Sequence, residues 1–215
     1  MSLFALDKEL IFPPVDLAEP DGLLAIGGDL SPERLLLAYR SGIFPWYEGE
    51  HILWWCPDPR FVLFPNELKV SKSMKKILNR EIFTFSENQN FREVIKNCQQ
   101  TNRKGQTGTW LSDELMESFI KLHEYGLAKS IEVWQNGELV GGFYGLQIGN
   151  VFCGESMFAK VSNASKAGFI HFVETHKNSL ELIDCQSHTE HLESLGAKMI
   201  SKKEFLKILY KNNER

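Results

Sequence analysis

The segment 42–60 constrains the fold of this chain more than any other. It reads GIFPWYEGEHILWWCPDPR and places Trp46, Trp54 and Trp55 within ten positions, interrupted by prolines. Because proline fixes its φ angle and has no backbone N–H to donate, the segment cannot form one long helix. Two interpretations stay open. The indoles form a stiff platform on which a flat base can stack, or they plug a hydrophobic core, where tryptophan is mostly found.

Composition places the chain among ordinary globular proteins. Its 215 residues are 43% hydrophobic and 24% charged, and this length suits one large domain or one domain with a small appendage. No apolar run approaches the roughly 18 residues of a membrane helix, and the N-terminus lacks a signal-peptide pattern. The four cysteines lie far apart without a CxxC pair. We therefore expect structural thiols in a reducing cytosol rather than a zinc site or a disulfide framework.

The net charge of −4 hides an uneven distribution of charge. Residues 1–60 carry ten acidic and four basic side chains, whereas residues 69–104 carry nine basic and three acidic ones. Clustered Lys and Arg bind a phosphate backbone by displacing its counterions, although a charge run is equally typical of a solvated face. The candidates for RNA contact are Lys69, Lys72, Lys75, Lys76 and Arg80.

Local patterns predict the order of helices and strands. Residues 12–30 are rich in turn residues, and Ser31-Pro32 starts a short helix that stops at Gly42. Further helices are expected at about 71–80, 88–101, 113–125, 163–177, 188–195 and 202–211. Strands are expected at 61–64, 130–135, 138–147, 151–158 and 180–186, with hairpin turns at Asn136-Gly137 and Gly149-Asn150.

This order predicts an α+β fold that is similar to that of GCN5-related N-acetyltransferases, with a mixed sheet flanked by helices. A member that uses CoA would need a Gly-rich pyrophosphate loop leading into a helix. Residues 155–160 read ESMFAK and contain no glycine. We therefore expect an acyl carrier other than CoA.

Nine short motifs occur in order along most of the chain. They are DGLLAIGGDLSPERLL at 21–36, GIFPW at 42–46, WWCPDPR at 54–60, GTW at 108–110, SIEVW at 130–134, LVGGFYG at 139–145, FCGESMF at 152–158, NASK at 163–166 and LIDCQ at 182–186. Together they resemble the family of leucyl/phenylalanyl-tRNA–protein transferases. These bacterial enzymes append Leu or Phe from aminoacyl-tRNA to proteins that begin with Arg or Lys.

The resemblance implies an organisation and a function. It implies a small N-terminal domain (1–62) joined to an acetyltransferase-like catalytic domain (63–215), acting as a cytoplasmic monomer without metal or CoA. The substrates would be Leu-tRNA or Phe-tRNA, with Met-tRNA as an alternative donor, together with proteins bearing N-terminal Arg or Lys. The modified proteins would be marked for degradation by the N-end rule pathway, and the basic residues listed above would grip the tRNA acceptor stem.

The resemblance also assigns the residues that bind the aminoacyl-tRNA end. Trp46 and Trp110 would contact the 3′-terminal adenosine, which suits the π-face of an indole. Phe143, Phe152 and Met157 would line the pocket for the aminoacyl side chain. Phe152 and Met157 lie five apart and would face opposite sides of a strand, so we expect a bulge near Gly154. The family has an aromatic residue where this chain has His176.

Three polar residues are the catalytic candidates. Converting an ester to an amide requires deprotonation of the incoming amine and stabilisation of an oxyanion. Asp184 and Gln186 are spaced i, i+2 and would share one strand face; the resemblance assigns both to catalysis, and Glu155 would hold a cationic amino group. Two alternatives from other classes remain, a CoA-dependent small-molecule acetyltransferase and a non-enzymatic RNA-binding module.

Overall fold

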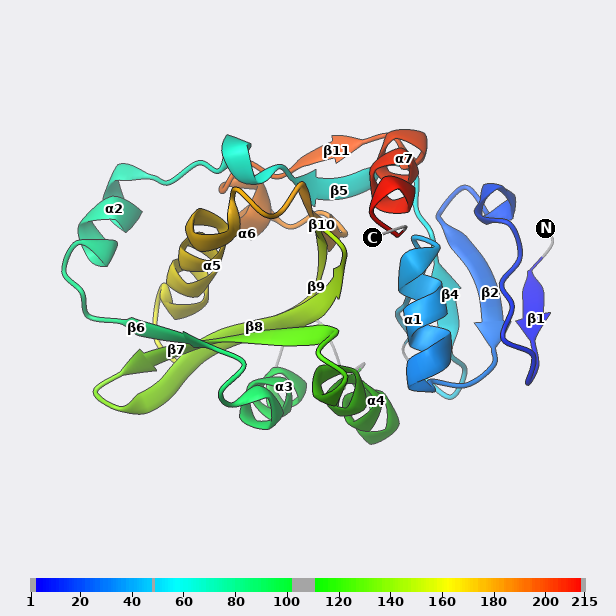
Figure 1. Ribbon diagram of the computed structural model, residues 1–215, viewed down its shortest axis with the longest axis horizontal. Helices are drawn as coiled ribbons and strands as arrows, with labels where there is room; N and C mark the ends of the chain where they lie inside the picture. The colour runs from blue at the N-terminus through cyan, green and yellow to red at the C-terminus, as the bar shows by residue number, and fades with distance from the viewer. Residues whose placement is uncertain (1–2, 48, 102–110, 214–215) are drawn as a thin grey trace.

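The computed structural model describes residues 3–47, 49–101 and 111–213 (Figure 1). Its first part is a four-stranded sheet in the order β1 (Phe4–Leu6), β2 (Leu23–Gly27), β4 (Leu53–Trp55) and β3 (Phe44–Pro45). β1 and β2 run parallel, and the other pairs are antiparallel. The 3₁₀ helix η1 (Val15–Leu17) and the helix α1 (Pro32–Arg40) complete this part.

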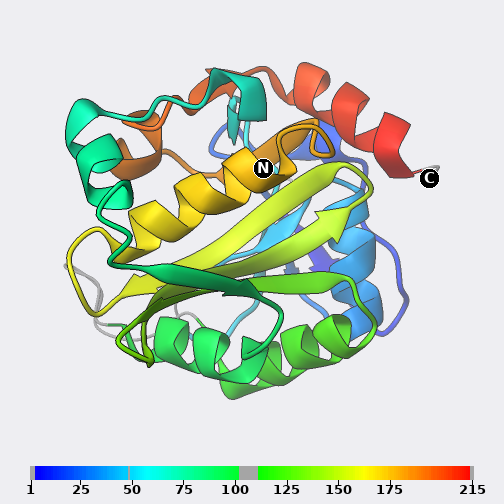
Figure 2. The same ribbon diagram turned by 60° about the vertical axis from the view of Figure 1, so that its left-hand side comes forward.

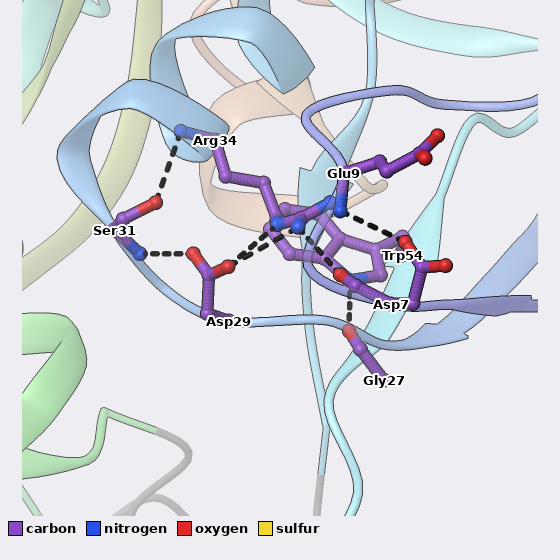
Figure 3. Close-up of polar contacts among 7 residues, drawn as sticks. All are labelled: Asp7, Glu9, Gly27, Asp29, Ser31, Arg34 and Trp54. Atoms are coloured by element: carbon purple, nitrogen blue, oxygen red, sulfur yellow. Dashed lines mark hydrogen bonds and ion pairs between the residues drawn. The ribbon is translucent and has the colours of Figure 1, made fainter.

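Arg34 fastens α1 to the four-stranded sheet (Figure 3). The helix starts where predicted, with the Ser31 hydroxyl accepting a hydrogen bond from the Arg34 backbone N–H. The buried Arg34 guanidinium binds the Asp29 carboxylate at 3.1 Å and the backbone oxygen of Asp7 at 2.7 Å. Beside it, Trp54 donates its indole N–H to the Gly27 oxygen at 2.9 Å. These contacts join the loop after β1, the loop after β2 and the first turn of α1.

The second part is a seven-stranded mixed sheet. Its order is β11 (Lys198–Ile200), β5 (Arg60–Leu63), β10 (Leu182–Gln186), β9 (Val151–Ala159), β8 (Glu138–Ile148), β7 (Ala128–Gln135) and β6 (Thr84–Glu87). β9 and β10 pair in parallel, whereas the other neighbours are antiparallel. β9 and β10 therefore lie side by side in the middle of this sheet, where their residues can meet.

Helices cover both faces of the seven-stranded sheet (Figure 2). α5 (Ala164–His176) crosses one face, and α3 (Phe91–Gln100) and α4 (Asp113–Glu124) pack on the other. Beyond α5 lies α2 (Lys72–Leu78), and the C-terminal helix α7 (Lys202–Asn213) packs near α1 (Figure 1). The short η2 (Pro65–Glu67) and α6 (Glu190–Glu193) complete the described part. Two hydrophobic cores result, one on each face.

The α+β class predicted from the sequence is confirmed, and so are its longer elements. All seven predicted helices form, and Asn136-Gly137 adopts positive φ angles of 54° and 81° in the predicted hairpin turn. The reading of 12–30 as loop was wrong at β2, and β1, β3, β4, β6 and β11 were not predicted. These strands are two to five residues long, too short for a periodicity signal, and they depend on pairing with distant strands.

The predicted division at residue 62 falls inside β5. β5 belongs to the seven-stranded sheet through its pairing with β10 and β11. The boundary between an N-terminal domain (1–62) and a catalytic domain (63–215) stays a prediction.

Candidate active site

A cavity of about 490 Å³ opens where the two sheets meet. Its walls come from the segment after α1, from the central strands β8, β9 and β10, and from α5 and α6. It brings together seven of the residues that the sequence singled out, namely Trp46, Phe143, Phe152, Glu155, Met157, Asp184 and Gln186. These residues span 140 positions of sequence, so the fold and not a local motif assembles the pocket.

One end of the pocket is an apolar recess. Phe143 on β8 and Phe152 on β9 are buried, with ring centroids 6.1 Å apart at an interplanar angle of 83°. Phe169 from α5 packs on Phe143 at 5.7 Å, and Met157 is partly buried beside them. The recess offers several ring edges and one flexible thioether. It can hold a medium-sized apolar side chain.

A β-bulge in β9 brings Phe152 and Met157 to the same pocket, as the spacing of these residues predicted. Tyr144 of β8 pairs with Ser156, whereas the next residue, Gly145, pairs with Gly154, so Glu155 has no partner of its own. A Cβ on Gly145 would lie 2.2 Å from the Cys153 oxygen, so only glycine fits opposite the bulge. The bulge re-aims the residues that follow it and places Glu155 at the pocket.

The tryptophans of segment 42–60 have different environments. Trp46 is 42% exposed and lines the pocket, and its ring lies 6.0 Å from that of the partly buried Trp55. The Trp55 indole N–H donates to the Trp46 backbone oxygen at 2.6 Å. Trp54 is fully buried in the core. Both interpretations of this segment therefore hold, each for a different ring; Trp110 lies outside the described residues.

Glu155 and Gln186 form a polar pair at the pocket wall. The Gln186 side-chain amide donates to the Glu155 carboxylate at 2.5 Å. Burial raises the pKa of Glu155 to about 7; the negative charge of Asp184 adds to the rise, and Tyr39, Gln186 and Arg60 oppose it. A carboxyl group with this pKa can exchange a proton near neutral pH.

Asp184 is held in a buried ion pair with Arg60. The Arg60 Nε donates to Asp184 Oδ1 at 2.8 Å, and Arg60 Nη2 donates to Asp184 Oδ2 at 2.7 Å. Both side chains are 1% exposed. This is the two-pronged geometry in which a guanidinium binds a carboxylate most tightly. Arg60 was not among the candidates, and its signal was a charge at the start of the otherwise apolar strand RFVL.

The prediction that Asp184 and Gln186 share one face by strict strand alternation was wrong. The pairing of β10 with β5 shifts register between these two residues, and Gln186 adopts a left-handed φ of 61°. Cys185 is the extra residue of this bulge. Both side chains still line the pocket, and the Gln186 backbone N–H donates to Asp184 Oδ1 at 3.0 Å.

The predicted RNA-contacting residues lie away from this pocket, on α2 and its flanks. All five are exposed, and none of their side chains forms an ion pair within the described residues. Met74 and the other apolar residues of α2 pack beneath them. The five RNA-contacting candidates are Lys69, Lys72, Lys75, Lys76 and Arg80.

His176 lies outside the pocket lining. It ends α5, where its ring packs on Phe172 at 4.7 Å and its Nε2 lies 2.8 Å from the Glu87 carboxylate. Other lining residues that the sequence did not single out include Tyr144, Phe169 and His191. Helical periodicity places Phe169 on the buried face of α5, but it cannot distinguish a pocket from a core. Among the described residues, no cluster of three His, Cys, Asp or Glu could hold a metal ion.

Fold and pocket together define an α+β enzyme whose site joins an apolar recess to an aromatic wall and a carboxylate–amide cluster. The sequence comparisons make this class specific. The family model described as leucyl/phenylalanyl-tRNA protein transferase matches residues 62–210, and the model of the N-terminal domain of that transferase matches residues 28–58. The chain therefore belongs to the leucyl/phenylalanyl-tRNA protein transferase family and is an aminoacyltransferase.

Curated relatives match nearly the whole chain. Leucyl/phenylalanyl-tRNA–protein transferases from Flavobacterium johnsoniae and Christiangramia forsetii are 59% and 54% identical to it. Each alignment covers 96% of this chain, with 99% and 100% of the relatives. The enzyme of the same name from Syntrophobacter fumaroxidans is 50% identical over 99% of this chain and 92% of its own length.

Solved structures give a weaker likeness. A GCN5-related N-acetyltransferase-like protein from Streptococcus suis aligns with 74% of this chain and 60% of its own, at 13% identity and a TM-score of 0.38. Within the described residues, no helix is long and apolar enough to cross a bilayer.

Proposed function

We propose that this chain transfers Leu or Phe from aminoacyl-tRNA to the N-terminal amine of proteins that begin with Arg or Lys. One observation carries the proposal: a single pocket holds an exposed indole, an apolar recess and a carboxylate–amide pair. An aminoacyl-tRNA end presents the matching groups, an adenine ring, an apolar side chain and a reactive ester.

The terminal adenosine would stack on Trp46, with Trp110 as a second contact. Trp46 is exposed and lines the pocket, and its backbone oxygen accepts a hydrogen bond from Trp55. The aminoacyl side chain would enter the recess of Phe143, Phe152 and Met157. The exposed lysines of α2 would attract the acceptor stem by charge, without reading its sequence.

Glu155 would accept the proton of the attacking amine. The amine nitrogen attacks the ester carbonyl, a C–N bond forms, the C–O bond to the ribose breaks, and the proton ends on the ribose oxygen. Glu155 suits this transfer because its raised pKa lies near the operating pH. Asp184 is less suited, because Arg60 occupies both of its oxygens. Because Arg60 neutralises Asp184, the acceptor's cationic Arg or Lys side chain would be attracted by Glu155 in its ionised form.

The reaction would take place in the cytoplasm, where aminoacyl-tRNA is found, with the protein acting as a monomer. The added Leu or Phe would mark the acceptor protein for degradation by the N-end rule pathway.

Transfer of label tests the proposal directly. The protein is incubated with Leu-tRNA carrying radiolabelled leucine and with a peptide that starts with Arg; a matched peptide that starts with Ala is the control. We expect label only in the Arg peptide. Absence of labelled peptide would refute the function, and equal labelling of both peptides would refute the acceptor preference. Acetyl-CoA in place of the tRNA should give no product.

A further inference from the structure

We propose that Arg60 is a positioning residue for aminoacyl transfer: it fixes the Asp184 carboxylate, and Asp184 in turn holds Gln186 against Glu155. This inference rests on the proposed function and adds the first residue of β5 to the residues that support aminoacyl transfer. Arg60 and Asp184 are separated by 124 positions in sequence. Their contact joins β5 to β10 beside the pocket.

The Arg60 guanidinium is held from several sides. Besides its two bonds to Asp184, Nη1 donates to the Gly42 backbone oxygen at 3.2 Å. The guanidinium carbon lies 4.6 Å from the ring centroids of both Phe44 and Phe205. The guanidinium is thus braced by the segment that leads to Trp46 and by α7. A planar guanidinium can donate two parallel hydrogen bonds to a carboxylate and also pack its flat faces on aromatic rings, whereas a lysine ammonium cannot do both.

Asp184 passes this constraint on to Gln186. Its Oδ1 accepts the Arg60 Nε–H and the Gln186 backbone N–H. The second bond spans the bulge in β10, where Gln186 has a φ of 61°. Since a non-glycine residue rarely adopts this conformation unaided, the carboxylate supports it. The Gln186 side chain then reaches Glu155 at 2.5 Å.

The chain of contacts therefore runs from Arg60 through Asp184 and Gln186 to Glu155. Each link is a hydrogen bond of 2.5–3.0 Å between described residues. Asp184, with both oxygens bound by Arg60, is an anchor in this arrangement rather than a proton acceptor. Arg60 is buried and does not line the pocket, so it would act only by placing the groups that do.

Arg60→Lys tests the role because it keeps the charge and removes the fork. We expect kcat to fall about 100-fold, the order of loss that a misplacement of about 1 Å causes, while the KM for aminoacyl-tRNA changes less than about threefold. Arg34→Lys is the control, because the buried Arg34 of α1 also pairs with an aspartate, the partly exposed Asp29 after β2, away from the pocket (Figure 3). It should lower the melting temperature and leave the kcat of the folded fraction unchanged.

A double-mutant cycle separates positioning from general destabilisation. If Arg60 acts through Gln186, then Gln186→Ala should cost less than about threefold in kcat when Arg60→Lys is already present, because residues that act as a unit are non-additive. If Arg60→Lys does not fold, the double variant Arg60→Met with Asp184→Leu replaces the ion pair by apolar groups, which folds often tolerate. That variant should bind aminoacyl-tRNA and lose transfer.

Three outcomes would overturn the role of Arg60. They are an unchanged kcat in Arg60→Lys, additive losses in the cycle, or normal transfer by the apolar double variant. Each is read against active wild-type protein, so the proposed function stands in these cases. Absence of transfer by the wild-type chain would instead remove the proposed function and this role with it.

Discussion

Replacing Trp46 by alanine tests the aromatic wall of the pocket most directly. The ring is 42% exposed, so its removal leaves no enclosed cavity, and we expect the free energy of unfolding to change by less than about 0.5 kcal/mol. The segment should keep its place because Trp55 holds the backbone oxygen of residue 46, and not its side chain. Any functional effect therefore reports on binding.

The magnitude follows from the stacking energy of one base. Stacking on an aromatic side chain contributes about 1–3 kcal/mol, and about 1.4 kcal/mol corresponds to a factor of ten. The KM for Leu-tRNA should therefore rise by about 5-fold to about 150-fold. Because stacking is made equally in the ground state and the transition state, kcat should change little.

The assay is the transfer of labelled leucine at varied Leu-tRNA and saturating Arg peptide. Trp54→Phe is the control, since Trp54 is fully buried outside the pocket and donates to the Gly27 oxygen. It should destabilise the protein by about 1–3 kcal/mol through lost volume and a lost hydrogen bond, with KM unchanged for the folded fraction. An unchanged KM in Trp46→Ala would refute the reasoning.

Three further predictions concern charge and backbone. Glu155→Gln should make the transfer rate fall less steeply below about pH 7, because only the acceptor amine still titrates. The Glu155 pKa is raised from 4.5 to about 7, so the stability of the wild-type fold falls as pH rises through this window. The variant should therefore unfold at a higher temperature than wild type at pH 8 but not at pH 5. Equal pH profiles would contradict Glu155 as the base. Three exposed lysines of α2 can be replaced by glutamate, namely Lys72, Lys75 and Lys76. The triple variant should bind tRNA more weakly in filter binding, and the slope of log K against log salt should fall by about 2–3. An unaltered slope would assign these lysines to a solvated face. Gly42→Ala should destabilise the fold by more than about 1 kcal/mol in urea denaturation, because φ is +78° and a Cβ would lie 2.6 Å from Leu206; Gly126→Ala, with φ +76° and nothing within 4 Å of its Cβ, should cost less, and equal costs would show that the Leu206 contact is unimportant.

The sequence by itself determined the features that depend on neighbouring residues. Apolar spacing predicted α3, the Ser112 cap and Gly126 bounded α4, Ser31-Pro32 marked the start of α1, and Asn136-Gly137 marked the β7–β8 turn. These signals are local: each arises from the φ angles and side chains of a few consecutive residues. The bulge near Gly154 was predicted in another way, because the family resemblance placed Phe152 and Met157 in one pocket, which a regular strand would not allow.

Only the tertiary structure decided which tryptophan lines the pocket and which packs in the hydrophobic core. Trp46, Trp54 and Trp55 lie within ten positions and have similar local signals, yet only Trp54 is fully buried. Its burial depends on Gly27 and α1, which reach it through the pairing of β2 with β4. Short strands such as β6 and β11 likewise exist only because distant partners bond to them.

The same holds for the charges at the site. Nothing near Asp184 in sequence indicates that Arg60 binds both of its oxygens, and nothing near Glu155 indicates the burial that raises its pKa. Ion pairing and desolvation depend on the distance between atoms and on the exclusion of water. Both quantities are set when β5, β9 and β10 come together, so the residue types were readable in the sequence and their chemical states were not.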